Sequence, residues 1–317
     1  MQPPFEFAIP SVVRRRALNL GDEGRAWLRS LDVDVPALVA EWDLELGEVL
    51  EGGSAAFVAE VTMPGGASGI LKIGVPGSDA GTREARILEA AAGEGYARIF
   101  RYDGPRRAML LERLGRRLVD LPMTPEKQMA TICEVLHVAW RQPPPGLDLM
   151  NGAQKADSLA EFITRLWNEL REPCSRAVLD QALAYAARRR AAYAPERAIL
   201  AHGDAHAANT LESLDGAATG FKFIDPEGMF IERAYDVSLS MRDWSEPFLE
   251  GGDSLARGWE RARFLASLTG VDAEAVWEWG FTERVSTGLL LKQLRSHYYG
   301  DEMLEVAEIW VRQLSDA

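Results

Sequence analysis

The 317-residue sequence predicts an α+β protein in two parts, a small antiparallel sheet carrying one helix and a larger helical part. Between residues 42 and 75, short runs alternate apolar and polar side chains and are separated by glycine-rich turns, which is typical of antiparallel strands. From residue 115 onward the helical period dominates. Hydrophobic residues make up 47% of the chain and charged residues 26%, a balance that excludes wholesale disorder.

A helical pattern precedes the predicted sheet. Over residues 14–41, apolar side chains recur near helical spacing, and the pattern is interrupted at Gly21 and around Pro36. Glycine and proline both disfavour helix interiors, so we expect breaks at these two positions. The first part of the protein is therefore predicted to span residues 1–113, with a helical extension over residues 1–41.

The sheet of the first part is predicted over residues 42–113. Its first three strands form a meander, because turns at Gly52-Gly53 and Pro64-Gly65-Gly66 separate them. The expected elements are strands at 42–50, 55–62 and 69–75, a helix at 79–92, and strands at 97–102 and 108–112.

The second part is predicted to be helical and to span residues 114–317. Thr124 and Pro125 form a suitable N-cap and first turn, and Ser158 with Glu161 form a capping-box pattern ahead of another helix. Further helices are expected at 175–193, 256–269, 273–280 and 282–311, and short apolar runs that interrupt the helical pattern at 199–200 and 221–224.

Charge and cysteine content narrow the functional classes. The net charge is −13 at pH 7, which disfavours nucleic-acid binding and mildly favours a cationic partner. Two cysteines are too few for a disulfide framework or a structural zinc site. Near the start, Glu6 precedes the run Arg14–Arg16, the reverse of a signal peptide, and no membrane span is expected. We therefore expect a cytoplasmic protein and predict no oligomeric state.

The densest polar cluster follows a short apolar run. His202, Asp204, His206 and Asn209 fall within eight residues, and Asp225 follows a second apolar run sixteen residues after Asn209. We expect the two loops to meet at one site.

Three interpretations of this cluster are open. In a phosphoryl-transfer site, Asp204 would accept the proton of a substrate hydroxyl, and Asn209 and Asp225 would bind Mg²⁺ through oxygen. In a hydrolase, His202, Asp204 and His206 would bind Zn²⁺, but no further histidine stands in a ligand-like context. In a purely structural loop, these side chains would only satisfy backbone groups.

The predicted sheet supports phosphoryl transfer. Lys72 is a lone cation in an apolar strand, twelve residues before Glu84 in the predicted helix at 79–92. Such a lysine–glutamate pair can contact nucleotide phosphates. A strand lysine more commonly extends to solvent, which is the structural alternative. The loop ending at Ser54 joins the first two strands, where it could cover phosphates.

These motifs resemble the aminoglycoside/hydroxyurea phosphotransferase family, which includes the streptomycin 6-phosphotransferases and has a two-lobed protein-kinase-like fold. The resemblance covers about residues 40–315. It rests on the lysine–glutamate pair above and on three strings, Met109-Leu110-Leu111-Glu112-Arg113, His202-Gly203-Asp204-Ala205-His206-Ala207-Ala208-Asn209 and the segment 224–236 from Ile224-Asp225-Pro226 to Glu232-Arg233-Ala234-Tyr235-Asp236.

The resemblance implies a role for each matching residue. Asp204 would be the catalytic base, and Asn209 and Asp225 would hold Mg²⁺. Asp236 would brace the catalytic loop, and His202 would be scaffold. The nucleotide, ATP or GTP, would be bound by Ser54, by Lys72 positioned by Glu84, and by Glu112, Arg113 and Leu114, whose backbone would contact the purine as the hinge between lobes.

The implied function is transfer of a γ-phosphoryl group to a hydroxyl of a small polar molecule, which we expect to be cationic. The best candidate is an aminoglycoside such as streptomycin, with antibiotic resistance as the result. Acidic residues of the second part, Asp243, Glu246, Glu278 and Glu283, could bind its cationic groups or lie on solvated helix faces. Trp244, Trp277 and Trp279 could wall a pocket, although Trp277 and Trp279 are expected in a core. A kinase of another metabolite and a non-catalytic nucleotide-binding protein are the alternatives.

Overall fold

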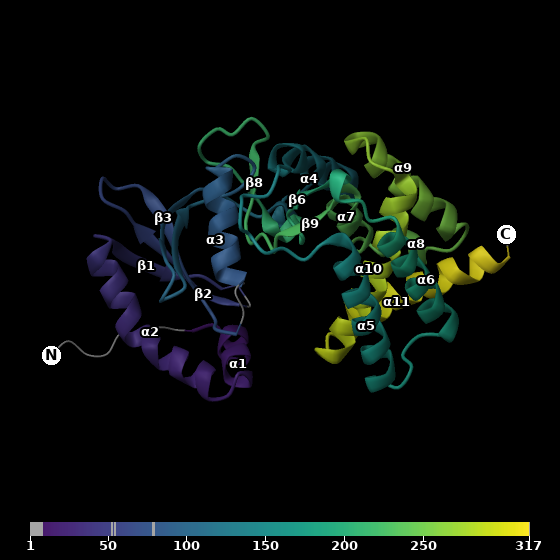
Figure 1. Ribbon diagram of the computed structural model, residues 1–317, viewed down its shortest axis with the longest axis horizontal. Coiled ribbons are helices and arrows are strands. Elements are labelled where there is room, and N and C mark those ends of the chain that lie inside the picture. The colour runs from purple at the N-terminus through teal and green to yellow at the C-terminus, as the bar shows by residue number, and fades with distance from the viewer. Residues whose placement is uncertain (1–8, 52, 54, 78–79, 317) are drawn as a thin grey trace. The chain divides into compact units, whose positions relative to one another are not determined.

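A computed structural model describes residues 9–51, 53, 55–77 and 80–316 (Figure 1). The chain divides into two compact units. The first comprises Met1–Gly115 and Glu212–Ile224, and the second comprises Arg116–Leu211 and Asp225–Ala317. Within the described residues, no helix is both long and apolar enough to cross a bilayer.

The first unit is built on a five-stranded antiparallel sheet with the strand order β1-β2-β3-β5-β4. Its strands are β1 (Glu45–Val49), β2 (Ala56–Thr62), β3 (Ser68–Gly74), β4 (Ile99–Asp103) and β5 (Ala108–Glu112). Its helices are α1 (Ser11–Asn19), α2 (Asp22–Glu41) and α3 (Ala80–Ala91). The predicted order of strands and helix is confirmed, with boundaries shifted by a few residues.

The two faces of this sheet carry different side chains, because successive residues of a strand point to opposite sides. Phe57, Leu71 and Ile73 share one apolar core with buried residues of α1 and α2. Lys72 lies between Leu71 and Ile73, so it points to the other face, where it binds Glu84 of α3. Figure 1 shows the purple helices α1 and α2 and the blue helix α3 on different sides of the sheet.

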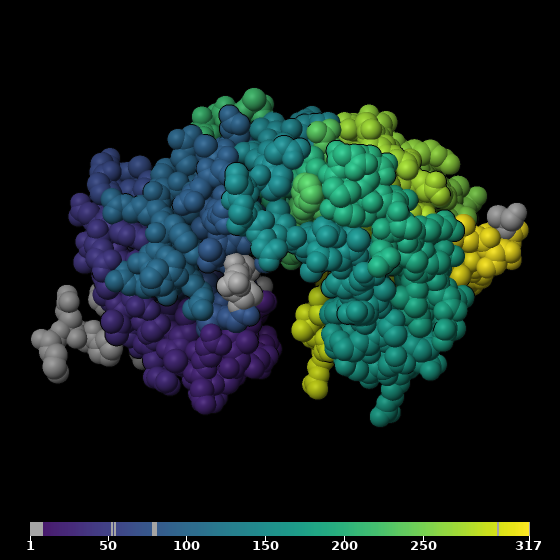
Figure 2. Space-filling model, viewed as in Figure 1, coloured from purple at the N-terminus to yellow at the C-terminus, as the bar shows by residue number. Residues whose placement is uncertain are grey.

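The second unit is mainly helical. Its helices are α4 (Pro125–Ala139), α5 (Gly152–Glu169), α6 (Arg176–Ala191), α7 (Arg233–Ser238), α8 (Glu246–Leu249), α9 (Ser254–Thr269), α10 (Ala273–Gln293) and α11 (His297–Ser315). The central helix is α10, which is buried continuously from Ala275 to Ser286 and contacts α5, α6, α7, α9 and α11. In the space-filling view, teal residues of the range that includes α5 and α6 form much of the visible face of the second unit (Figure 2).

Two predicted helix boundaries are wrong for local reasons. Pro36 lies inside α2 without ending it, because its neighbours Val35 and Leu38 are fully buried and their packing outweighs the lost backbone hydrogen bond. The capping box of α5 is formed by Asn151 and Gln154, so this helix begins before the predicted Ser158.

The helices predicted at 273–280 and 282–311 also differ from those observed. Helix α10 continues through Gly280, and the break comes at Arg295, which has a left-handed φ of 62°. Gly280 serves close packing, since a Cβ there would lie 2.5 Å from Cβ of Met241.

The segment Glu212–Ile224 groups with the first unit, although the predicted boundary at residue 113 had placed it in the second. It contains most of a small two-stranded sheet of β7 (Thr210–Glu212) and β8 (Phe221–Phe223). The buried ammonium of Lys222 lies 2.9 Å from both carboxylate oxygens of Glu112, and Phe223 accepts a 2.8 Å hydrogen bond from the amide of Ala97. These contacts attach the segment to the sheet of the first unit.

Candidate active site

The loop His202–Asn209 follows β6 (Ala198–Ala201) and is held by a buried carboxylate. Asp236 of α7 is fully buried and accepts hydrogen bonds from the amides of His202 and Gly203, both at 2.8 Å, and from the indole of Trp140 at 3.0 Å. The loop also bonds to itself, since Nδ1 of the buried His202 accepts from the Asp204 amide at 3.1 Å. Asp236 and His202 therefore fix the backbone from His202 to Asp204.

We predict that Asp236→Ala destabilises the protein by about 2–4 kcal/mol, because the substitution leaves three buried donors unsatisfied. Denaturant unfolding of the two proteins measures the difference. The substitution Asp253→Ala removes one exposed N-cap from α9 and is expected to cost only about 1 kcal/mol. An Asp236→Ala variant no less stable than Asp253→Ala would contradict the bracing role.

Asp204 is held on both carboxylate oxygens. Its Oδ1 accepts from the Arg242 guanidinium at 3.0 Å, and its Oδ2 lies 3.2 Å from Nε2 of His206 and 3.3 Å from the Asn209 amide nitrogen. Burial opposes ionisation, but the His206 hydrogen bond and the Arg242 charge outweigh it and hold the pKa of Asp204 well below its usual range. With 32% of its side chain exposed, the carboxylate is fixed, ionised and accessible.

Arg242 connects Asp204 to the buried carboxylate of Glu283. Its Nη1 lies 3.9 Å from Glu283 of α10, which also lies 3.2 Å from the Lys155 ammonium and accepts 2.6 Å from the Tyr235 hydroxyl. Sequence reasoning missed Arg242 and Lys155. Neither lies in a motif, and Arg242 is 38 residues from Asp204, so only the packing of α5, α7 and α10 shows the network.

The two candidate metal ligands lie on segments tied to the same loop. Asn209 donates its amide hydrogens to the backbone oxygen of Asp204 at 3.0 Å, so its Oδ1 is the atom suited to a metal. Asp225 has a left-handed φ of 56°, and three residues later Gly228 donates to the His202 carbonyl at 3.0 Å. An amide oxygen and a carboxylate are the hard donors that Mg²⁺ prefers.

The zinc-hydrolase interpretation is not supported by this geometry. Nδ1 of His202 is engaged by the Asp204 amide in a fully buried position. Across the described parts of the chain, no three histidine, cysteine or acidic side chains are placed to hold a metal ion together.

A cavity of about 300 Å³ lies beside the loop, within the second unit. His206 and Arg242, the two side chains that hold the Asp204 carboxylate, contribute to its lining. The remaining lining residues are Val119, Ala207, Ala208, Asp243, Trp244, Ser245, Glu246, Tyr299, Glu302 and Met303. Three of them are acidic, so the cavity wall suits a polar, cationic molecule.

The acidic residues considered from sequence fall into two groups. Asp243 and Glu246 line the cavity. Glu278 and Glu283 are buried in α10, so the expectation that they meet a substrate or solvent is wrong. Glu278 pairs instead with Arg189 at 2.6 Å. Trp244 lines the cavity, whereas the other two tryptophans, Trp277 and Trp279, lie in the core as expected.

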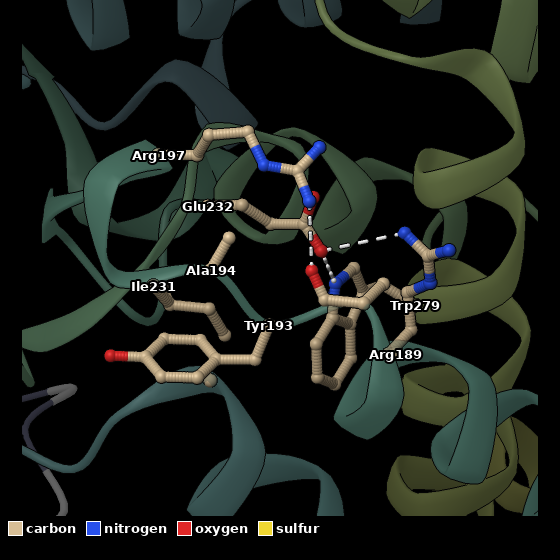
Figure 3. A pocket seen from close by; sticks show the side chains of 9 residues that line it. Arg189, Tyr193, Ala194, Arg197, Ile231, Glu232 and Trp279 are labelled. Atoms are coloured by element: carbon tan, nitrogen blue, oxygen red, sulfur yellow. Dashed lines mark hydrogen bonds and ion pairs between the residues drawn. The ribbon is translucent and has the colours of Figure 1, made fainter.

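A second, much smaller cavity lies between α6, β9 (Met229–Glu232) and α10 (Figure 3). Its volume is about 10 Å³, room for about one water molecule. Glu232 accepts from the Trp279 indole at 3.0 Å and faces the Arg189 guanidinium at 3.5 Å, so the polar groups drawn there largely satisfy one another. It is too small to hold an organic substrate.

In the first unit, the predicted lysine–glutamate pair is formed. The Lys72 ammonium donates to both Glu84 carboxylate oxygens at 2.6 and 2.8 Å. The two side chains are 13% and 10% exposed, so the ammonium is oriented but reachable. Ser54 lies outside the described residues.

The three residues predicted to contact a purine lie at the end of β5. The Glu112 amide donates to the Arg98 carbonyl at 2.8 Å, and its carboxylate binds Lys222. Arg113 reaches across to Glu60 of β2 at 2.7 Å, and its guanidinium also contacts the Leu114 carbonyl. The side chains of Glu112 and Arg113 are thus engaged within this unit, and Leu114 is buried.

Three solved structures share a similar fold and are recorded with, or named for, different small molecules. The GDP and kanamycin complex of APH(2")-IIia is 16% identical and has a TM-score of 0.56, covering 87% of this chain and 97% of its own. Aminoglycoside phosphotransferase APH(3'')-Id from Streptomyces rimosus, in complex with ADP and streptomycin, is 14% identical and has a TM-score of 0.52. The match covers 81% of this chain and 98% of that one. The ethanolamine kinase of Plasmodium vivax is 16% identical and has a TM-score of 0.52, with 93% of each chain covered. At these identities the likeness establishes the kinase-like fold that the sequence predicted.

The family is established by sequence. A comparison with curated proteins finds no significant match. The model of the family described as aminoglycoside/hydroxyurea antibiotic resistance kinase matches residues 42–288, which is more than three quarters of the chain. The protein therefore belongs to the aminoglycoside/hydroxyurea antibiotic resistance kinase family and is a small-molecule O-phosphotransferase.

Proposed function

We propose that this protein transfers the γ-phosphoryl group of ATP or GTP to a hydroxyl of an aminoglycoside such as streptomycin, and that the modification confers resistance. The observation that carries the proposal is the Asp204 carboxylate, fixed by Arg242, His206 and Asn209 beside an acidic cavity of about 300 Å³. Transfer to a hydroxyl requires a fixed group that accepts the hydroxyl proton and a cavity that holds the molecule carrying that hydroxyl.

Asp204 would orient the acceptor hydroxyl for in-line attack on the γ-phosphorus. As the oxygen–phosphorus bond forms and the bond to the nucleoside diphosphate breaks, the hydroxyl proton passes to Asp204. Its depressed pKa makes it a weak base, which suits a loose transition state in which the proton leaves late and positioning supplies most of the acceleration.

The nucleotide side of the reaction is assigned to residues of the first unit. Lys72, oriented by Glu84, would neutralise charge on the nucleotide phosphates, and the backbone of Glu112, Arg113 and Leu114 would contact the purine. The loop that contains Ser54 would cover the phosphates.

Asn209 and Asp225 would hold Mg²⁺, since their side chains supply the oxygen donors that suit it. When bound, the ion would neutralise negative charge on the transferring phosphoryl group.

The proposed acceptor is cationic because the cavity wall is acidic. Asp243, Glu246 and Glu302 contribute three carboxylates, and the whole chain has a net charge of −13. Solved relatives of the fold are recorded with kanamycin and with streptomycin, both of which are polycationic. A guanidinium or ammonium group would gain charge-assisted hydrogen bonds at this wall.

A nucleotide-consumption screen tests the proposal. The protein is incubated with Mg²⁺, with ATP or GTP, and with each of a panel of aminoglycosides and of small amino alcohols such as ethanolamine, and the Asp204→Asn variant serves as the blank. We expect aminoglycoside-dependent turnover, greatest for streptomycin. Turnover with an amino alcohol but with no aminoglycoside would identify a metabolite kinase and refute the resistance function.

A further inference from the structure

The segment Met241–Glu246 joins the cavity to the catalytic loop. Residues 242–246 all line the cavity, and Arg242 also holds Oδ1 of Asp204. Within this segment, Trp244 has a φ of 52°, in the left-handed region that a bulky aromatic residue rarely adopts. Such a conformation persists only where surrounding groups impose it. Two arginines, one from α9 and one from α10, form hydrogen bonds to this segment.

Arg261 of α9 holds the two carbonyl groups on either side of the strained bond. Its Nη1 donates to the Asp243 carbonyl at 2.7 Å and its Nη2 to the Trp244 carbonyl at 3.1 Å. The guanidinium lies 4.1 Å from the centre of the Phe248 ring. Because both donors belong to one planar group, they fix the relative orientation of the two carbonyls.

Arg284 of α10 holds the two ends of the same segment. It donates to the Met241 carbonyl from Nε at 3.1 Å and from Nη2 at 2.5 Å, and from Nη1 to the Ser245 hydroxyl at 2.9 Å. The side chain is fully buried, against the rings of Phe248 and Trp310. Burial and the nearby Arg261 charge lower the pKa of Arg284 to about 9.

A fully buried cation without a bound carboxylate is costly, and Arg284 forms no ion pair with any residue that the structure describes. An apolar side chain of similar length would fill the same space without that desolvation cost. Fold stability alone therefore gives little reason for an arginine here. Its three hydrogen bonds to Met241 and Ser245 supply one, because they fix the cavity-lining segment.

We propose that Arg261 and Arg284 are positioning residues that pre-form the segment Met241–Glu246 for binding of the acceptor. This inference rests on the proposed function, because it assigns the cavity beside Asp204 to the acceptor. A segment ordered before binding spares the acceptor the entropic cost of ordering it. Neither arginine is among the nucleotide-binding residues proposed above, so we expect their loss to act on the acceptor and not on ATP.

The kinetic test uses Arg261→Met, with Arg261→Lys and Arg263→Met as references. Arg263 lies two residues along the same helix, is exposed and packs on Trp259. Arg263→Met is therefore the same substitution at a residue that packs elsewhere. We expect Arg261→Met to raise the acceptor KM about ten-fold or more while the ATP KM changes less than about two-fold. Arg261→Lys restores part of the loss, and Arg263→Met is unchanged. Equal changes in both KM values would overturn the proposal.

The structural test needs no acceptor. In crystals of the Arg261→Met variant, the proposal requires Trp244 to leave the left-handed region and the segment to move into or away from the cavity. A segment unmoved, with Trp244 still at positive φ, overturns the proposal whatever the acceptor is. Arg284→Lys is the second variant for the same comparison. Lysine is chosen because Arg284 is fully buried and a smaller change is more compatible with folding there. A wild-type protein without aminoglycoside turnover would count against the proposed function, and the crystals would still decide the positioning role.

Discussion

The Asp204→Asn variant is expected to lose at least about a thousand-fold in kcat while retaining the fold and the affinity for nucleotide. Asparagine preserves the shape of the side chain and one acceptor oxygen, which can still face Arg242. It cannot accept the hydroxyl proton. Steady-state kinetics with the acceptor, together with calorimetric titration of ATP, separate the two effects.

The matched control for this substitution is Asp180→Asn. Asp180 lies exposed on α6, where it pairs with Arg176 at 2.8 Å, so its loss should leave kcat unchanged.

The low pKa of Asp204 predicts the pH profile of kcat. The residue stays ionised down to mildly acidic pH, so its protonation should not reduce kcat near pH 5. An Asp204→Asn variant with normal kcat would remove the catalytic role.

The second large effect is expected from Lys72→Met, which should lower kcat/KM for ATP about a hundred-fold and leave the acceptor KM nearly unchanged. Methionine fills the same space on β3 without the ammonium that Glu84 orients at 2.6 Å. The loss of a cation at the phosphates acts on the nucleotide side of the reaction alone. Lys127→Met, an exposed lysine on α4, is the control for removing one positive charge.

The substitution Lys72→Met also leaves the partly buried Glu84 carboxylate without the cation that it binds. The double variant Lys72→Met/Glu84→Gln should therefore recover stability in thermal unfolding but not activity. Recovery of activity in the double variant would show that Lys72 acts only by stabilising the fold.

Much of this architecture could be predicted from sequence because its signals are local. Alternating side chains and glycine turns mark the strands of the sheet, and the spacing from Lys72 to Glu84 anticipates an ion pair that the structure contains. In the short loop from His202 to Asn209, the candidate catalytic and metal-binding residues Asp204 and Asn209 lie within eight residues of sequence. Such features depend on neighbours within one or two elements of the chain.

The features that escaped prediction depend on distant packing. Arg261 and Arg284 lie on ordinary helical stretches, and Arg242 lies in a turn. Only the tertiary fold brings Arg242 to Asp204 and the other two guanidinium groups to the segment Met241–Glu246. Glu278 and Glu283 have the sequence context of surface residues, yet both are buried in α10 and paired with arginine or lysine. Charge alone does not distinguish a substrate-binding carboxylate from an internal ion pair.

The most direct test of the central claim is mass spectrometry of streptomycin after incubation with the protein, ATP and Mg²⁺. The account predicts a product heavier by one phosphoryl group, formed in step with ADP, with the phosphate on a hydroxyl oxygen. The Asp204→Asn variant should form none within the same time. Unmodified streptomycin, with ATP consumed only to free phosphate, would contradict the assignment of streptomycin as acceptor.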